Sequence, residues 1–76
     1  MELKKFIEDF SAQFEETDAS VISSNTNFRD LNEWSSLQAL SIIAMVDEEY
    51  SVKIKGDDIR NSETIQQLFD IVKSRL

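Results

Sequence analysis

A helical pattern between residues 37 and 50 is the feature that most limits how this chain can fold. Its apolar residues recur at spacings of three and four, as on one face of a helix: Leu37, Leu40, Ile43, Val46 and Tyr50. Three further apolar residues widen that face: Ile42, Ala44 and Met45. Such a helix lies at the centre of a bundle or also offers apolar surface to a partner, and the sequence is compatible with both.

Two serines, Ser35 and Ser36, stand where this helix is predicted to begin. A serine there can accept a hydrogen bond from a free backbone N–H group, which is a common structural role. The helix start also presents unpaired amides and a partial positive charge, which favour a bound anion. The two serines are therefore the first candidates for chemistry, although the residues alone favour a capping or solvent-facing serine at position 36.

The charge and composition exclude several classes of function. The chain has 8 basic and 15 acidic residues and a net charge of -7, which would repel nucleic acid and anionic lipid. We therefore expect basic protein partners. Neither Cys nor His is present, which excludes a thiolate metal site and removes the commonest zinc ligand, and we predict no metal site. An enzyme is poorly supported without these residues, although a Ser/Lys arrangement stays possible.

Because 76 residues can support only one core, we expect a single domain over residues 1–76. No apolar run approaches the length of a signal peptide or a membrane span, so we expect a cytoplasmic protein, and we expect it to be a monomer.

Two further long helices are predicted, one near each end of the chain. The first covers residues 2 to about 16 and buries Leu3, Phe6, Ile7, Phe10 and Phe14. The last begins with a capping box, in which the Thr64 hydroxyl accepts from the Gln67 amide and the Gln67 side chain reaches back. Its predicted buried stripe consists of Ile65, Leu68, Phe69, Val72 and Leu76.

The connections between these helices differ in length and character. Residues 17–34 form a long loop rich in Ser, Thr, Asn and Asp, which must be anchored by its apolar residues: Val21, Ile22, Phe28, Leu31 and Trp34. Its polar residues Asn25, Asn27 and Asp30 are better explained by solvation than by cation binding, because no Gly-centred calcium loop surrounds them.

Residues 51–56 alternate apolar and polar side chains, yet a single strand would have no partner. We therefore predict an extended linker that turns Val52 and Ile54 inward. Gly56 is expected to permit a tight turn into a third helix of about one turn. Asp57 and Asp58 are interpreted as solvated rather than catalytic, because adjacent helical residues point in different directions.

Three stretches of the chain resemble acyl carrier proteins, particularly the branch that carries Trp-Asp-Ser-Leu: residues 28–31 (Phe-Arg-Asp-Leu), 34–37 (Trp-Ser-Ser-Leu) and 47–54. The likeness covers nearly the whole chain. It implies an all-α four-helix bundle with three main helices, a short third helix and a long first loop. It also implies that Ser36 receives 4'-phosphopantetheine from coenzyme A and then carries an acyl intermediate as a thioester, with the interior between the helices as the expected shelter for the acyl chain.

Two departures from the family pattern bear on this resemblance. Ser35 stands where the family usually has Asp, so it lacks the carboxylate that the family is thought to offer to magnesium during arm transfer. The early turns of the helix carry Gln38, Ala39 and Ser41, where many fatty-acid carriers have acids. This second departure suits a carrier dedicated to another pathway.

The resemblance also implies which residues meet partners. The expected partners are a holo-synthase, which is a phosphopantetheinyl transferase, and acyl-loading and acyl-transferring enzymes with basic docking patches. The expected contact residues are Glu33, Leu37, Leu40, Ala44, Asp47 and Glu48. The alternative is an unmodified adaptor that keeps the carrier fold and binds a protein partner through the same helix.

Overall fold

The computed structural model describes all residues 1–76 and contains helices but no strands. The four α-helices are α1 (Leu3–Ser11), α2 (Ser36–Tyr50), α3 (Gly56–Arg60) and α4 (Ile65–Ser74), and two 3-10 turns cover Ala19–Val21 and Phe28–Asp30. The predicted all-α fold is confirmed, with three longer helices, a short third helix and a long first loop. No helix is both long and apolar enough to cross a membrane.

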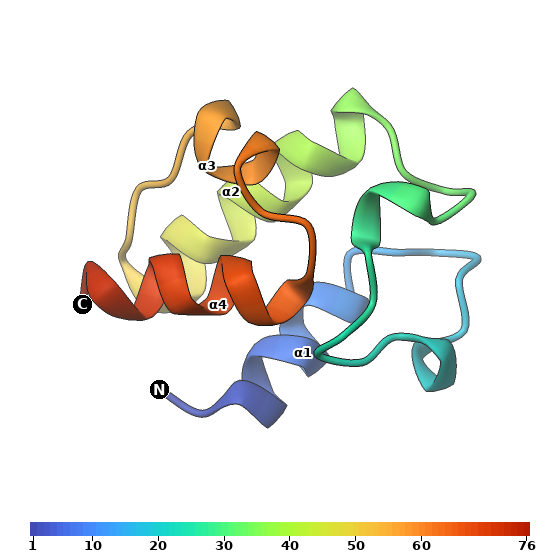
Figure 1. Cartoon of the computed structure of the whole chain (residues 1–76), viewed down its shortest axis with the longest axis horizontal. Helices are drawn as coiled ribbons and strands as arrows, with labels where there is room; N and C mark the ends of the chain where they lie inside the picture. The colour runs from blue at the N-terminus through green and yellow to red at the C-terminus, as the bar shows by residue number, and fades with distance from the viewer.

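The four helices enclose one apolar core. Helix α1 contacts α2 and α4, and α3 contacts the same two helices, so the contacts form a closed ring. In Figure 1, α4 lies between α1 below and α3 above, while the first loop, residues 12–35, occupies the right-hand side. Fifteen buried apolar residues form one cluster inside, to which all four helices contribute. The core therefore fixes where α2 begins relative to the other helices.

Aromatic rings join α1 to the segment that precedes α2. Phe10 and Phe28 are fully buried, and their ring centroids lie 5.5 Å apart. The Trp34 ring packs edge-on against Phe28 at 5.0 Å and stacks on Phe14 at 6.4 Å. The prediction that the three Phe residues of the first helical segment are core residues is thus confirmed, since Phe6 is also fully buried.

Helix α1 is shorter than predicted, because it ends at Ser11 rather than near Glu16. The amides of Gln13 and Phe14 donate to carbonyls only three residues back, which tightens the last turn. The amides of residues 15–17 then donate to the side chain of Glu33 instead of continuing the helix. A partner 16 to 18 residues away in the sequence therefore sets this helix end.

The first loop is anchored largely as predicted. Ile22 and Phe28 are buried, and Leu31 and Trp34 pack against the core from partly buried positions. Val21 is the exception, with 60% of its surface exposed, because the inward position at this turn is taken by the neighbouring Ile22.

Backbone hydrogen bonds tie this loop to the start of α4. The amides of Ile65 and Gln66 donate to the carbonyls of Thr26 and Ser24, at 3.3 and 2.9 Å. Two of the otherwise free amides of α4 are thereby satisfied.

The segment between α2 and α3 is extended, with Val52 and Ile54 buried, as predicted. The expected role of Gly56 is wrong: it is the first residue of α3 and does not have a positive φ. The left-handed residue is Ser51, with a φ of 57°, directly after α2. The chain reverses at the end of α2 rather than at its only glycine.

Two predictions about the C-terminal third also need correction. Asp58 is not simply solvated, because its carboxylate accepts hydrogen bonds from Arg75 at 2.7 and 2.8 Å and from the Lys55 amide at 2.8 Å. Leu76 is not part of the buried stripe of α4, since the helix ends at Ser74 and leaves Leu76 64% exposed. The other four residues of that stripe are buried.

The Thr64 cap of α4 is confirmed, with a distance of 3.2 Å from the Gln67 amide to the Thr64 hydroxyl oxygen. The side chain of Gln67 reaches back as well, but it accepts from the amide of Glu63 rather than from that of Thr64. The cap therefore extends one residue further upstream than a standard capping box.

Candidate functional site

The start of α2 gives its two serines different roles. Ser35 is the N-cap, with an extended backbone, and its hydroxyl oxygen accepts from the Gln38 amide at 3.3 Å. Ser36 is the first residue of the helix and is exposed. The capping function predicted for a serine at this point is therefore performed by Ser35, which leaves the Ser36 hydroxyl open to solvent.

The backbone around Ser36 suits an anion. The first amides of an α-helix have no carbonyl partner in a preceding turn. Here the Gln38 amide donates to the Ser35 side chain, and the Ala39 amide makes the first regular helix hydrogen bond, to the Ser35 carbonyl. The amides of Ser36 and Leu37 remain as donors beside the hydroxyl, at the positive end of the helix dipole. A phosphate ester on Ser36 would find complementary charge and donors at this position, so the residues present fit such a group.

Glu33 connects the first loop to the start of α2. One carboxylate oxygen accepts from the amides of Glu16 and Thr17 and from the Thr17 hydroxyl, at 2.8 to 3.0 Å. The other accepts from the Glu15 amide at 2.8 Å and from the Gln38 side chain at 3.3 Å. The sequence analysis missed this arrangement, because nothing in the local pattern links residue 33 to residues 15–17.

The pKa of Glu33 reflects these contacts. Partial desolvation raises it, but hydrogen bonds from the Thr17 side chain and from the amides of residues 15–17 lower it more, so the pKa lies below its ordinary value of 4.5. The carboxylate is therefore charged near neutral pH and already engaged in five hydrogen bonds. Its expected contact with a partner stays a prediction.

The faces of α2 differ from those expected. Leu37 and Leu40 belong to the predicted core stripe, yet they are 75% and 61% exposed. The buried residues are Ile42, Met45 and Val46. The periodicity was correct for a helix, but more apolar residues are present than one face can bury, so spacing alone does not identify the face that meets the core.

The exposed leucines continue into an exposed face along α2. Leu37, Leu40 and Ala44 are exposed at helical spacing, and Asp47 and Glu48 follow on the same side one turn later. We call these five residues the α2 face. They are the residues of α2 expected to meet partners: Leu37 and Leu40 lie near Ser36, whereas Asp47 and Glu48 lie near the other end of the helix.

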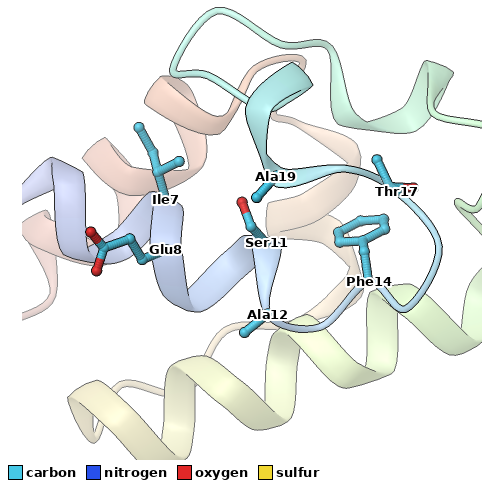
Figure 2. Close-up of a pocket in the computed structure, with 7 residues that line it drawn as sticks. All are labelled: Ile7, Glu8, Ser11, Ala12, Phe14, Thr17 and Ala19. Carbon is cyan, nitrogen blue, oxygen red and sulfur yellow. The ribbon is translucent and has the colours of Figure 1, made fainter.

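Two open hollows occur on the surface, and both lie along the first loop. One, of about 340 Å³, is lined by Ile7, Glu8, Ser11, Ala12, Phe14, Thr17 and Ala19, and Figure 2 shows it between α1 and the loop. The other, of about 420 Å³, is lined by Glu16, Thr17, Val21, Leu31, Asn32 and Glu33. Neither hollow contains Ser36, and the chain has no cluster of three or more acidic residues placed to hold a metal ion.

Comparison with protein families gave one match. Residues 5–72 match the family model described as a phosphopantetheine attachment site. The match covers nearly the whole chain of 76 residues. No curated protein and no solved structure gave a significant match.

Proposed function

The chain belongs to the phosphopantetheine attachment site family, and we propose that within this family it is an acyl carrier protein that bears the arm on Ser36. Members of the family are carriers without catalytic activity of their own, to which 4'-phosphopantetheine is attached covalently. When bound, the arm supplies a thiol that holds the carried group as a thioester.

One observation supports Ser36 most strongly. Of the two adjacent serines, Ser35 uses its hydroxyl oxygen to cap α2, whereas the Ser36 hydroxyl is exposed on the first turn of a 15-residue helix. In the proposed transfer, the Ser36 oxygen attacks the phosphorus that bears the pantetheine unit of coenzyme A. A P–O–P bond breaks, the nucleotide half leaves, and the hydroxyl proton passes to a base on the transferase. The free amides of Ser36 and Leu37 would then lie beside the new phosphodiester.

Partners are proposed to dock on the α2 face. Carrier domains of this kind interact with phosphopantetheinyl transferases and with partner enzymes. The exposed Leu37, Leu40 and Ala44 offer apolar surface, and Asp47 and Glu48 offer charge to a basic patch. Glu33 would contribute through its charge rather than as a free hydrogen-bond acceptor.

Intact mass after incubation with coenzyme A and a broad-specificity phosphopantetheinyl transferase tests the assignment. The natural chain and Ser35→Ala should each gain one phosphopantetheine, and Ser36→Ala should gain none. A gain by Ser36→Ala would refute the choice of serine. If the natural chain gains nothing, the unmodified adaptor becomes the better account.

Ser35→Asp tests the departure from the family at position 35. A carboxylate there restores a potential magnesium ligand. Its negative charge also interacts favourably with the dipole of α2 and should stabilise the helix by about 0.3–1 kcal/mol. We expect faster arm transfer at fixed magnesium concentration. Equal initial rates for Ser35→Asp and the natural chain would mean that Ser35 does not slow the reaction.

A further inference from the structure

The helix that begins at Ser36 has no charged side chain near its start. Residues 36–46 contain no acid and no base, and the first acid of α2 is Asp47. Along the helix axis Asp47 lies roughly 16 Å from Ser36, because each residue adds about 1.5 Å. The two acids of α3 are each paired with an arginine. A partner with a basic surface therefore finds little free negative charge on these helices close to Ser36.

The first loop supplies negative charge at this position. Residues 12–35 contain five acids and one basic residue, so they carry -4 of the chain's net charge of -7. Residues 51–76, by contrast, contain five basic and four acidic residues. Glu33 joins the loop to α2, because its carboxylate accepts a hydrogen bond from the Gln38 side chain at 3.3 Å. The acidic loop therefore lies beside the first turn of α2, as Figure 1 also shows.

The larger of the two hollows, of about 420 Å³, lies in this loop and is lined by two apolar, two polar and two acidic residues. The apolar residues are Val21, which is 60% exposed, and Leu31, which is partly buried. The acids are Glu16 and Glu33, and no basic residue lines the hollow. An occupant must therefore suit both an apolar wall and negative charge.

The two acids of the hollow differ in what they can still bind. The Glu33 carboxylate already accepts five hydrogen bonds within the chain, so it contributes mainly charge. The Glu16 side chain is exposed and has no hydrogen bond or ion pair, although its backbone amide donates to Glu33. A cationic group in the hollow can therefore pair directly with Glu16 and is also attracted by Glu33.

An enzyme that acts on Ser36 also covers the edge of this hollow. Three residues span at most about 11 Å, so Glu33 lies within that distance of Ser36. A standard protein interface covers about 800 Å² on each partner, which corresponds to a patch about 16 Å in radius. A partner centred on Ser36 therefore reaches Glu33.

We propose that this hollow receives an arginine side chain of the phosphopantetheinyl transferase that modifies Ser36, so that the first loop and the α2 face together form the docking surface. This inference rests on the proposed function and identifies one partner contact within it. The methylene stem of an arginine packs against Val21 and Leu31, and its guanidinium group pairs with Glu16. An anion would be repelled by the two acids, and a purely apolar group would desolvate Glu16 without pairing it.

The experiment measures arm transfer by a broad-specificity transferase at several carrier concentrations, which gives kcat and KM for each variant. Glu16→Gln should raise KM by about two- to fivefold in about 0.05 M sodium chloride and by less in about 0.5 M, because exposed ion pairs are screened. Val21→Ser should raise KM by about two- to fivefold at both salt concentrations, because apolar contacts are not screened. Neither variant should change kcat.

Glu2→Gln is the matched control, because it removes the same charge from a distant part of the molecule. Glu2 is exposed and its side chain does not cap α1. The N-terminus and the start of α2 lie on opposite sides of the molecule in Figure 1. The KM of this variant should equal that of the natural chain. If Glu16→Gln and Val21→Ser also equal the natural chain, this inference is wrong and the proposed function stands. If the natural chain takes no arm, both are wrong.

A photoreactive amino acid in place of Val21 tests direct contact with an arginine. It should crosslink to a segment of the transferase that contains an arginine, as located by mass mapping of the crosslinked peptides. The same amino acid in place of Glu2 should not crosslink. If the amino acid at position 21 does not crosslink, or reacts with a segment that contains no arginine, the assignment of this occupant is wrong.

Discussion

Glu33 shows how one side chain can determine the shape of the region around the candidate site. Its carboxylate accepts the amides of residues 15–17, which a longer α1 would have used, and it also holds the side chain of Gln38 in the first turn of α2. Three consecutive amides that point at one site form a turn that binds an anion, and here the bound anion is the Glu33 carboxylate of the same chain. The end of α1 and the start of α2 are therefore positioned by the same residue.

Replacing Glu33 with Gln should destabilise the fold at neutral pH, because an amide carries no charge and offers one acceptor oxygen for the five donors. The pKa of Glu33 is lowered in the folded state, so its stabilising effect is present above the ordinary value of 4.5 and is lost as pH falls through the lower folded pKa. Urea unfolding of both proteins between pH 7 and about pH 3 measures this.

The comparison has a matched control in Glu63→Gln, because Glu63 is exposed and its side chain makes no hydrogen bond within the chain. That variant should stay close to the natural chain at every pH. The stability deficit of Glu33→Gln should shrink as the solution becomes more acidic. A deficit that is constant with pH would show that the ionised carboxylate is not what stabilises this region.

At the scale of helices, starts were more predictable than ends or faces. Both caps depend on residues within one turn, so the sequence identified Thr64 and limited the other cap to Ser35 or Ser36. The end of α1 depends on Glu33, far along the chain, and no local pattern indicates it. Which face of α2 is buried depends on how α1 and α3 pack against it, so the apolar spacing placed Leu37 and Leu40 in the core although they are exposed.

The sequence predicted the position of the candidate site but not the separate roles of its two serines. The motif around Trp34 and Ser36 indicated the serine and the family, and a family comparison confirms the family. The sequence did not distinguish the roles of Ser35 and Ser36 physically, because both fit a helix start. The hydrogen bond from Gln38 to Ser35 makes that distinction, and it depends on a backbone geometry that only the structure provides.

The end of α2 carries a testable strain. Ser51 has a φ of 57° and a ψ of 34°, a left-handed conformation that is unfavourable for residues with a Cβ atom. Ser51→Gly should stabilise the fold by about 0.5–1 kcal/mol, or roughly 2–8 °C in unfolding temperature for a chain of this size. Thermal unfolding followed by circular dichroism measures the shift.

Gly56→Ala provides the opposite substitution as a control. Gly56 is the first residue of α3, and its φ is not positive. An added methyl group would meet only the Arg60 side chain, at 3.4 Å. Introducing Ala there should therefore be tolerated, whereas Ser51→Val should lose stability because a β-branched residue is poorly suited to the left-handed region. If Ser51→Gly is no more stable than the natural chain, the strain assigned to Ser51 is not significant.

At the scale of the whole molecule, the charge is large for the size. The net charge is -7, and the molecule extends only 29 × 23 × 20 Å. At 0.01 M salt the Debye length of about 30 Å spans the entire molecule, whereas at 0.1 M it is about 10 Å. Repulsion between acids on opposite sides is therefore felt in dilute buffer and is screened at moderate salt.

Unfolding temperature should accordingly rise with sodium chloride between about 0.01 and 0.5 M, and most of the rise should occur below about 0.1 M. Salt also weakens favourable ion pairs, but this opposing effect is small. The pairs of Lys5 with Asp9 and of Arg75 with Asp58 are partly exposed, and such pairs contribute about 0–1 kcal/mol each. Thermal unfolding across this salt range is the measurement.

Two comparisons separate general screening from a specific ion effect. The double variant Glu48→Gln with Glu49→Gln removes two exposed negative charges at the end of α2, so it should be more stable in dilute buffer and respond less to salt. Magnesium chloride at matched ionic strength should act like sodium chloride, because the chain has no cluster of acids placed to hold a metal ion. An unfolding temperature independent of sodium chloride would rule out repulsion as a limit on stability. An unfolding temperature that rises with magnesium alone would require an ion site among exposed acids such as Asp47, Glu48 and Glu49. These acids would then bind an ion in addition to any role in docking.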